Sequence, residues 1–502
     1  MYRLFEILPG LLSWTTLILV VFLSWQKPVW IAVFIILFDT YWLLKTIYLS
    51  LHLRSAFNKT RQNLKTDWFG MLVGTKKNYQ EIYHLIILPM FDEPYGIVKE
   101  TFESLIKSNY PKDKMIVVLA TEDKIGKPAA IIADKIKQEF SGKFFKFLVT
   151  SHPSDLPGEI PGKGSNEAWA AKEVKKHLID PLKINYENIL VSVFDVDTQV
   201  YPEYFGCLTY HFLTCDKPQR SSFQPIPLFT NNIYEAPAFG RVVSFSSTFW
   251  HMMLQARAER LTTFSSHAMP FKALVEIGYW QKNVVSEDSR IFWQCYLHYD
   301  GNWRVVPLFY PVSMDANVAP TLWKTLVNVY KQQRRWGFGA ENIAYFLDGF
   351  RKNKKIPLRA KLYWTFNILE GFHSYATNSI ILFALGWLPL IIGGASFGIT
   401  LLSYKLPRIT RAIMSFSAVG IASSAILSII FLPPRPDGEK LKAKQYILYF
   451  FQWALLPITL IIFGSIPALE SQTRLMLGGK FRLGFWVTPK GRYRESEPAQ
   501  VK

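Results

Sequence analysis

The sequence predicts an α/β fold: a mixed, mainly parallel sheet in a cytosolic domain, joined to a bundle of transmembrane helices. Two observations support this prediction. Long uncharged runs concentrate at both ends of the 502-residue chain, whereas the middle, about residues 52–360, has the composition of a soluble protein. Within that middle part, short apolar runs alternate with helical segments of about 10–15 residues, which is typical of βαβ units.

The first two apolar runs predict a pair of transmembrane helices. Ile7–Trp25 carries no charge, and Val29–Leu51 follows after a short turn. About 20 apolar residues are enough to cross a hydrocarbon core of about 30 Å. Basic residues follow the second run closely, which predicts a cytoplasmic N-terminus and a cytoplasmic middle part; they are Arg54, Lys59, Arg61 and Lys65.

The C-terminal apolar region predicts four further spans. Pro389 and the pair Gly393-Gly394 divide its first part, so we expect a hairpin there. The expected spans are 368–388, 390–404, Ile409–Leu432 and Gln445–Ile466. Six spans in all keep the basic C-terminal tail on the cytoplasmic side, as the positive-inside rule expects, and place Pro433–Lys444 outside. Five spans would place the tail outside, against that rule. The expected parts are 1–51, 52–360, 361–467 and a cytosolic tail, 468–502.

The charge and the cysteines exclude several classes of protein. The formal net charge is +19, but the basic residues flank apolar runs. Membrane orientation and anionic lipid therefore explain the charge better than nucleic acid does. The three cysteines, Cys207, Cys215 and Cys295, have neither an even count nor CxxC spacing. They predict neither a disulfide framework nor a zinc site.

Carboxylates follow the predicted strands of the middle part. The strands are Tyr83–Leu88, Met115–Ala120, Phe144–Val149 and Ile189–Phe194, and the carboxylates after them are Asp92, Glu122, Asp123, Asp195 and Asp197. Ligands bind at the carboxyl ends of parallel strands, so this shared position makes each a site candidate. Any one of them alone would more often be a loop carboxylate or a helix cap.

Asp195-Val196-Asp197 is the strongest candidate for a metal site. In an extended stretch, alternate side chains share a face, so both carboxylates can point into one site. A divalent cation held by carboxylates neutralises the charge of a departing diphosphate. The sequence therefore predicts Mg²⁺ or Mn²⁺ at Asp195 and Asp197.

Three other segments have two interpretations each. Gly158–Ser165 lacks phosphate-loop spacing, which excludes ATP hydrolysis, but Lys163 at the start of a helix is either a phosphate ligand or a solvated lysine. Ser286-Glu287-Asp288 is either catalytic or a helix cap with first-turn acids. Gln332, Arg335 and Trp336 share a face of a predicted helix, Leu322–Phe346. In one interpretation, Arg335 binds a diphosphate and Trp336 stacks on a sugar ring. In the other, the helix lies at the membrane interface with its tryptophan at the level of the lipid headgroups.

Five motifs in order give the chain a resemblance to a known family. They are Pro89-Met90-Phe91-Asp92-Glu93-Pro94, Asp195-Val196-Asp197, Ser286-Glu287-Asp288, Gln332-x-x-Arg335-Trp336 and Phe485-x-Val487-Thr488-x-Lys490. The chain resembles membrane-integrated family 2 glycosyltransferases such as cellulose synthase and hyaluronan synthase. The resemblance implies a GT-A-like, Rossmann-like domain. It also implies a multi-pass plasma-membrane enzyme with a cytoplasmic site.

The resemblance further implies inverting transfer of a sugar, from a nucleotide-sugar such as a UDP-sugar to a growing polysaccharide. It makes Asp288 the general base, with Glu287 as the other catalytic candidate. It makes Asp195 a nucleotide ligand and Asp197 the metal ligand. Donor-binding roles fall on Glu93, Glu122, Asp123, Lys163, Asp195, Gln332, Arg335, Trp336, Thr488 and Lys490.

The chain departs from the family pattern at a few positions. Glu122-Asp123 stands where paired aspartates are common, Ser286 replaces a threonine, and Phe485–Lys490 lies near the C-terminus. Two alternative functions stay open: transfer of a single sugar to a lipid-linked acceptor, and a transporter or receptor that binds nucleotide-sugars without transferring them.

Overall fold

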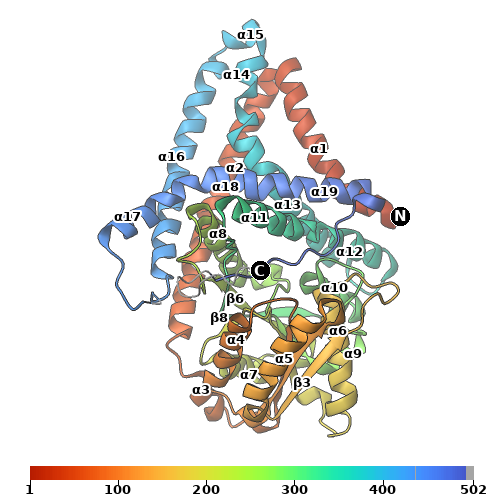
Figure 1. Cartoon of the computed structure of the whole chain (residues 1–502). Coiled ribbons are helices and arrows are strands. Elements are labelled where there is room, and N and C mark those ends of the chain that lie inside the picture. The colour runs from red at the N-terminus through yellow and green to blue at the C-terminus, as the bar shows by residue number, and fades with distance from the viewer. Residues whose placement is uncertain (436, 493–502) are drawn as a thin grey trace.

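The computed structural model describes residues 1–435 and 437–492, so residues 493–502 of the predicted tail lie outside the described residues. The parts are arranged in three levels (Figure 1). The sheet lies at one end of the molecule. Helices α11 (Leu322–Gly337), α18 (Leu456–Leu460) and α19 (Ile466–Leu477) lie across the middle, and upright helices extend to the other end.

The sheet has eight described strands in the order β3-β2-β1-β4-β7-β6-β8-β5. The strands are β1 (Tyr83–Pro89), β2 (Met115–Glu122), β3 (Lys146–His152), β4 (Ile189–Val193), β5 (Gln199–Val200), β6 (Ser221–Phe229), β7 (Ala268–Pro270) and β8 (Arg304–Met314). The first four are parallel, as are β6 and β8, whereas β7 and β5 pair antiparallel with their neighbours. The predicted mixed α/β sheet is confirmed.

The strands form where the sequence can bury both faces of the sheet. All residues of β2 and β4 are buried. In β1, Leu85 and Ile87 join one hydrophobic core while Ile86 and Leu88 join another, as the two-residue period of a strand requires. The helices of this domain are α3 (Trp68–Gly74), α4 (Tyr95–Lys107), α5 (Lys127–Phe140), α6 (Lys163–Val174), α7 (Tyr204–Thr214), α8 (Ala238–Gln255), α9 (Phe271–Glu276) and α10 (Glu287–His298).

Four described helices are long and apolar enough to cross a membrane: α1 (Tyr2–Gln26), α2 (Pro28–Asn63), α16 (Leu401–Ile430) and the run Ala443–Leu477. A fifth is possible if α13 (Leu358–Phe383) and the following Leu385–Ile392, bent by 47°, form one broken span. The structure thus has four or five candidates, whereas we expected six.

The expected hairpin of spans 368–388 and 390–404 does not form. Instead α13 bends into α14 (Leu388–Ile392), α15 (Gly394–Gly398) follows, and α16 begins at Leu401. Gly394 has a φ of +77°, which an L side chain rarely adopts, so the chain turns at this glycine. The glycine pair therefore makes the connection between two upright helices, at the end of the molecule farthest from the sheet (Figure 1).

The expected span Gln445–Ile466 runs crosswise to the other long helices. It divides into α17 (Ala443–Phe451) and α18, and the chain continues into α19, which packs on α1 (Figure 1). Ser13 of α1 donates a hydrogen bond of 2.7 Å to Gln472 of α19. Tyr234 of the sheet domain donates to the carbonyl of Pro433. The segment 433–444 therefore begins on the same side as the sheet, and not on the far side as expected.

The predicted single helix Leu322–Phe346 is two helices. α11 ends at Gly337, one turn of 3₁₀ helix covers Phe338–Ala340, and α12 (Glu341–Lys352) begins at Glu341. α11 packs on α19, whereas α12 packs on α1 and α10. The break lets the two segments face different neighbours.

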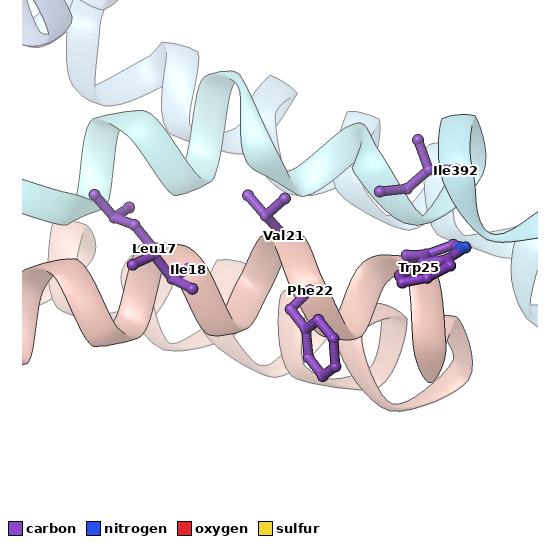
Figure 2. A pocket seen from close by; sticks show the side chains of 6 residues that line it. All are labelled: Leu17, Ile18, Val21, Phe22, Trp25 and Ile392. Atoms are coloured by element: carbon purple, nitrogen blue, oxygen red, sulfur yellow. The ribbon is translucent and has the colours of Figure 1, made fainter.

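An apolar groove lies between the second half of α1 and α14 (Figure 2). Its side chains are aliphatic or aromatic: Leu17, Ile18, Val21, Phe22, Trp25 and Ile392. The groove belongs to the upright helices, away from the sheet and its carboxylates (Figure 1).

Candidate active site

Lys163 lies at the centre of a buried cluster of carboxylates, next to the carboxyl end of strand β4. Its ammonium nitrogen lies 2.9 Å from Oδ1 of Asp195, and 3.0 and 2.9 Å from Oδ1 and Oδ2 of Asp288. An oxygen of Glu167 lies 3.5 Å from the same nitrogen, and an oxygen of Glu287 lies 4.0 Å from it. The structure therefore joins the segment after β4, the start of α6 and the start of α10 in one site.

Sequence reasoning missed Glu167. It lies one helical turn after Lys163 on α6 and is fully buried. Its spacing of four from Lys163 was the available signal, because residues four apart share a helix face. Its two carboxylate oxygens accept no hydrogen bond from any described residue, and the same holds for Glu287.

Burial and neighbouring charges shift the pKa of each of these groups. Burial alone would lower the pKa of Lys163, but Asp195 and Asp288 raise it well above its usual value. Burial raises the pKa of Glu287 to about 8, and the negative charge of Asp288 adds to the effect. Burial also raises the pKa of Glu167 well above its usual value. At neutral pH Lys163 is therefore charged, and Glu287 favours the protonated form.

Asp195 has the opposite environment to the two glutamic acids. Burial would raise its pKa, but the ammonium groups of Lys163 and then Lys490 bring the pKa below its usual range. The hydroxyl of Ser265 donates a hydrogen bond of 3.0 Å to its second oxygen. Asp195 is therefore ionised, with one oxygen facing Lys163 and the other Ser265.

Asp197, the second carboxylate of the predicted pair, is held by the C-terminal tail. Oδ2 of Asp197 accepts hydrogen bonds from Lys490 at 2.8 Å and from the backbone amide of Asp315 at 2.9 Å. The side chain is fully buried, and its Oδ1 has no hydrogen-bond partner among the described residues. One oxygen of Asp197 is thus satisfied within the protein, and the other is available to a ligand.

Asp315 and Arg492 extend this part of the site, and neither was predicted as a site residue. Two nitrogens of Arg492 lie 2.7 and 3.1 Å from Oδ1 of Asp315, and the guanidinium also contacts Glu100. Burial, then the charge of Asp197, raises the pKa of Asp315 to about 6. Asp315 directly follows β8, which was not among the predicted strands, so the rule that selected the other carboxylates did not reach it.

The tail crosses the start of α6 before it reaches Asp197. A Cβ on Gly162 would meet Cγ of Phe485 at 2.6 Å, and Gly162 has a φ of +148°. Only glycine fits there, because both the backbone conformation and the close approach exclude a side chain. The guanidinium of Arg335 lies 4.9 Å from the centroid of the Phe485 ring. The tail motif and α11 therefore meet over the residue that precedes Lys163.

The three predicted residues of α11 have different surroundings. Trp336 packs against Phe229 and Phe264, with ring centroids 6.0 and 5.8 Å apart. Arg335 is close enough to Asp195 and Glu287 to lower the pKa of both, after the larger effects already described. Gln332 is half-buried. Arg335 therefore faces the carboxylate cluster, while Trp336 belongs to a separate aromatic group.

Two other predicted donor-binding residues, Glu93 and Thr488, are buried. Glu93 is buried and accepts a hydrogen bond of 2.7 Å from the amide of Phe91. Burial raises its pKa to about 7, with smaller effects from Lys490 and Asp197. Thr488 is buried as well, and its hydroxyl has no hydrogen-bond partner among the described residues.

Glu122 and Asp123 lie farther along the sheet. Glu122 is the last residue of β2 and Asp123 follows it, and β1 separates β2 from β4. Burial raises the pKa of Glu122, and the smaller effect of His152 opposes it. Asp123 accepts a hydrogen bond from Ser151. No hydrogen bond or ion pair within 1–435 and 437–492 joins these two residues to Asp195 or Asp197.

Two sets of carboxylates are candidates for binding a divalent cation. Among the described residues, one group of three carboxylates brings its oxygens within 4.8 Å of one another; it consists of Glu167, Glu287 and Asp288. The ammonium of Lys163 already lies among those three. Asp195 and Asp197 carry hard oxygen atoms of the kind that Mg²⁺ and Mn²⁺ prefer, and the buried Oδ1 of Asp197 has no hydrogen-bond partner in the described part of the chain, so that oxygen could serve as a ligand.

No family model matches the sequence, and no curated protein matches it. Similar solved structures include a mannosyltransferase from Pyrobaculum calidifontis in complex with GDP-Man and Mn²⁺, with 13% identity, a TM-score of 0.40, and coverage of 83% of this chain and 97% of that one. Residues 1–349 of S. aureus TarS in complex with UDP-GlcNAc give 13% identity, a TM-score of 0.39, and coverage of 79% and 91%. At these TM-scores the likeness carries no argument about this chain.

Proposed function

We propose that the protein is a membrane-bound inverting glycosyltransferase of family 2 that transfers a sugar from a nucleotide-sugar to a growing polysaccharide. One observation carries the proposal. Lys163 joins Asp195 and Asp288, which come from two separate segments of the chain, in one buried site. A sugar transferase needs these elements together: carboxylates for a cation, positive charge for a diphosphate and a base for the acceptor.

In this proposal Asp197 and Asp195 hold Mg²⁺ or Mn²⁺, through the free Oδ1 of Asp197 and an oxygen of Asp195. The bound cation would neutralise charge on the departing diphosphate. Lys490 and Arg335 add positive charge beside the two carboxylates, since both act on Asp195. Thr488, buried with a free hydroxyl, and Glu93 complete the donor side.

Asp288 is the better of the two candidate bases. A general base must be ionised at the working pH to accept the proton of the acceptor hydroxyl. Burial raises the pKa of Glu287 to about 8, so Glu287 favours its protonated form at neutral pH. The Lys163 ammonium contacts both oxygens of Asp288 and stabilises its charge. The base is therefore assigned to Asp288.

The membrane arrangement follows from the crosswise helices. We propose that α1, α2, the bent pair α13–α14 and α16 cross the membrane, and that α17–α19 lie in the interface. Four crossings keep the N-terminus, the sheet and the tail on the cytoplasmic side of the plasma membrane, in agreement with the basic residues at the end of α2 and just after it. Trp336, beside Phe229 and Phe264, would then offer an aromatic surface to the acceptor sugar between the site and the membrane helices.

A donor panel tests the function. The detergent-solubilised protein is incubated with UDP- and GDP-sugars plus Mg²⁺ or Mn²⁺, and nucleotide release and products are measured. Donor-dependent nucleotide release with a lengthening oligosaccharide is expected. Binding of a donor without release would favour a transporter or receptor instead.

A vesicle assay tests polymer export. The protein is reconstituted in sealed vesicles, and the donor is added outside. Oligosaccharide should collect in the lumen. Products of one added sugar, all left in the outer leaflet or outside, would favour transfer to a lipid-linked acceptor.

A further inference from the structure

The loop just before Asp288 and helix α10 is held by a residue outside all of the recognised motifs. Oε1 of Glu341 accepts three hydrogen bonds from this loop: from the amide of Val285 at 2.9 Å, the amide of Ser286 at 3.0 Å and the hydroxyl of Ser286 at 2.8 Å. Glu341 is 3% exposed. It is the first residue of α12, where the break after α11 brings it next to α10.

We infer that Glu341 is a positioning residue: it orients the start of α10 so that the Asp288 carboxylate meets Lys163 and the acceptor. The inference rests on the proposed function and adds a residue to it. Asp288 lies only two residues after Ser286, so the direction of the first turn of α10 sets where its carboxylate points. A misplacement of about 1 Å at a reacting group can cost about 10²-fold in rate.

The hydrogen bonds of Ser286 support a positioning role over simple helix capping. Ser286 occupies the N-cap position of α10, yet its side chain makes no capping hydrogen bond to that helix. Its hydroxyl donates to Glu341 and accepts a hydrogen bond of 3.2 Å from Asn342. The loop is therefore tied to α12 by the Ser286 side chain, and its orientation depends on the neighbouring helix.

Asn342 reinforces the same connection. Its amide also donates to the hydroxyl of Ser289 at 2.9 Å, and its carbonyl oxygen accepts from Arg290. The first two residues of α12 thus hold the first turn of α10 at several points. Hydrogen bonds that a buried carboxylate accepts from two amides and a hydroxyl are costly to lose, because the buried donors are left unsatisfied.

The hydrogen-bonding role of Glu341 can be separated from its charge. Its other oxygen lies 4.0 Å from Arg482 of the tail, which also contacts Glu6. Glu341→Gln keeps an oxygen that can accept all three hydrogen bonds but removes the charge, whereas Glu341→Ala removes both. Asp348→Ala is the matched control, because Asp348 lies on the same helix and its carboxylate contacts Arg351 and Lys352 instead.

The kinetic test compares these variants with the donor that the wild type uses. Glu341→Ala should lower kcat by about 10- to 100-fold and leave the donor KM within about twofold, because the donor side is held elsewhere. Glu341→Gln should keep kcat within about threefold of wild type, since the acceptor atom stays. Asp348→Ala should leave kcat unchanged. An unaltered kcat in Glu341→Ala, or a Gln variant as slow as the Ala variant, would overturn the inference.

Two further measurements keep the test decisive. If Glu341→Ala does not fold, Ser286→Ala removes one of the three hydrogen bonds and should lower kcat at unchanged KM; an unaltered kcat would contradict the inference. Amide hydrogen exchange at Val285 and Ser286 should be slow in wild type and in Glu341→Gln, and fast in Glu341→Ala. The exchange measurement does not require the enzyme to be active. A wild type that turns over no donor would refute the proposed function alone, while equal exchange in all variants would refute the role of Glu341.

Discussion

The ammonium of Lys490 lies 2.8 Å from Oδ2 of Asp197, and this contact joins the C-terminal tail to the segment after β4. Burial would lower the pKa of Lys490, but Asp197 and then Asp195 raise it, so the lysine is charged. Each carboxylate of the predicted metal pair is therefore next to a lysine from a distant part of the chain. The tail motif forms part of the same buried site as the sheet.

Lys490→Met should lower turnover by at least about tenfold, because a charge-assisted contact to the donor side is lost and a buried carboxylate loses its partner. The donor KM should rise in parallel. Steady-state kinetics with varied donor would measure both effects. Lys480→Met, elsewhere in the tail, is the control and should behave as wild type; equal kinetics in the two variants would remove Lys490 from the site.

Asp197→Ala should reduce transfer by several orders of magnitude without unfolding the protein, because its free oxygen is the proposed cation ligand. Removing the divalent cation with a chelator should have the same effect on the wild type, and adding Mg²⁺ or Mn²⁺ should restore activity. Full turnover in excess chelator would contradict a metal-dependent mechanism. Thermal unfolding of the variant would show whether the loss is catalytic.

Asp288→Asn should lower kcat by at least about 10²-fold, because the amide cannot accept the proton of the acceptor hydroxyl. Donor affinity should change little. Glu287→Gln is the matched comparison: burial raises the pKa of Glu287 to about 8, so the neutral amide resembles its normal state and should cost little. If instead the Glu287 variant is the inactive one, the base is Glu287.

The buried carboxyl group of Glu93 should make the stability of the folded protein depend on pH. Burial raises its folded pKa from 4.5 to about 7, so its contribution to stability is fully present below pH 4.5 and is lost as the pH rises through about 7. Glu93→Gln mimics the protonated acid and should gain stability relative to wild type over that window, by an amount on the order of 3 kcal/mol at most.

The measurement for Glu93 is the difference in Tm between variant and wild type at pH 5 and at pH 8. The difference should grow in favour of the variant at the higher pH. Glu103→Gln, whose side chain is 38% exposed, is the control and should show no such trend. A constant difference for Glu93→Gln would mean that its carboxyl does not titrate in this range.

Local patterns in the sequence were sufficient for the first four strands of the sheet and for proposing part of the candidate site. Mostly aliphatic runs such as Ile189–Val193 are buried on both faces when they form strands between helices. Because parallel strands end at one edge of a sheet, Asp195 could be placed in a site before the fold was known. The same rule applied to β8 would have included Asp315.

The number and direction of membrane helices were less well determined by the sequence. Hydropathy identifies apolar segments but carries no information about which helix each one packs against. Gln445–Ile466 is apolar enough for a span, yet the run Ala443–Leu477 that contains it ends in α19, which packs across the first half of α1 through the Ser13–Gln472 contact. Only the packing decided that this segment lies crosswise.

The sequence by itself determined which side chains carry charge, which runs are apolar and which residues follow strands, because these properties depend on neighbours along the chain. Only the tertiary structure decided that Lys490 reaches Asp197 and that Glu341 holds the loop before Asp288. Lys490 and Glu341 are far along the chain from the groups they contact. Contacts of that kind depend on how the helices and the sheet pack, and no local spacing encodes them.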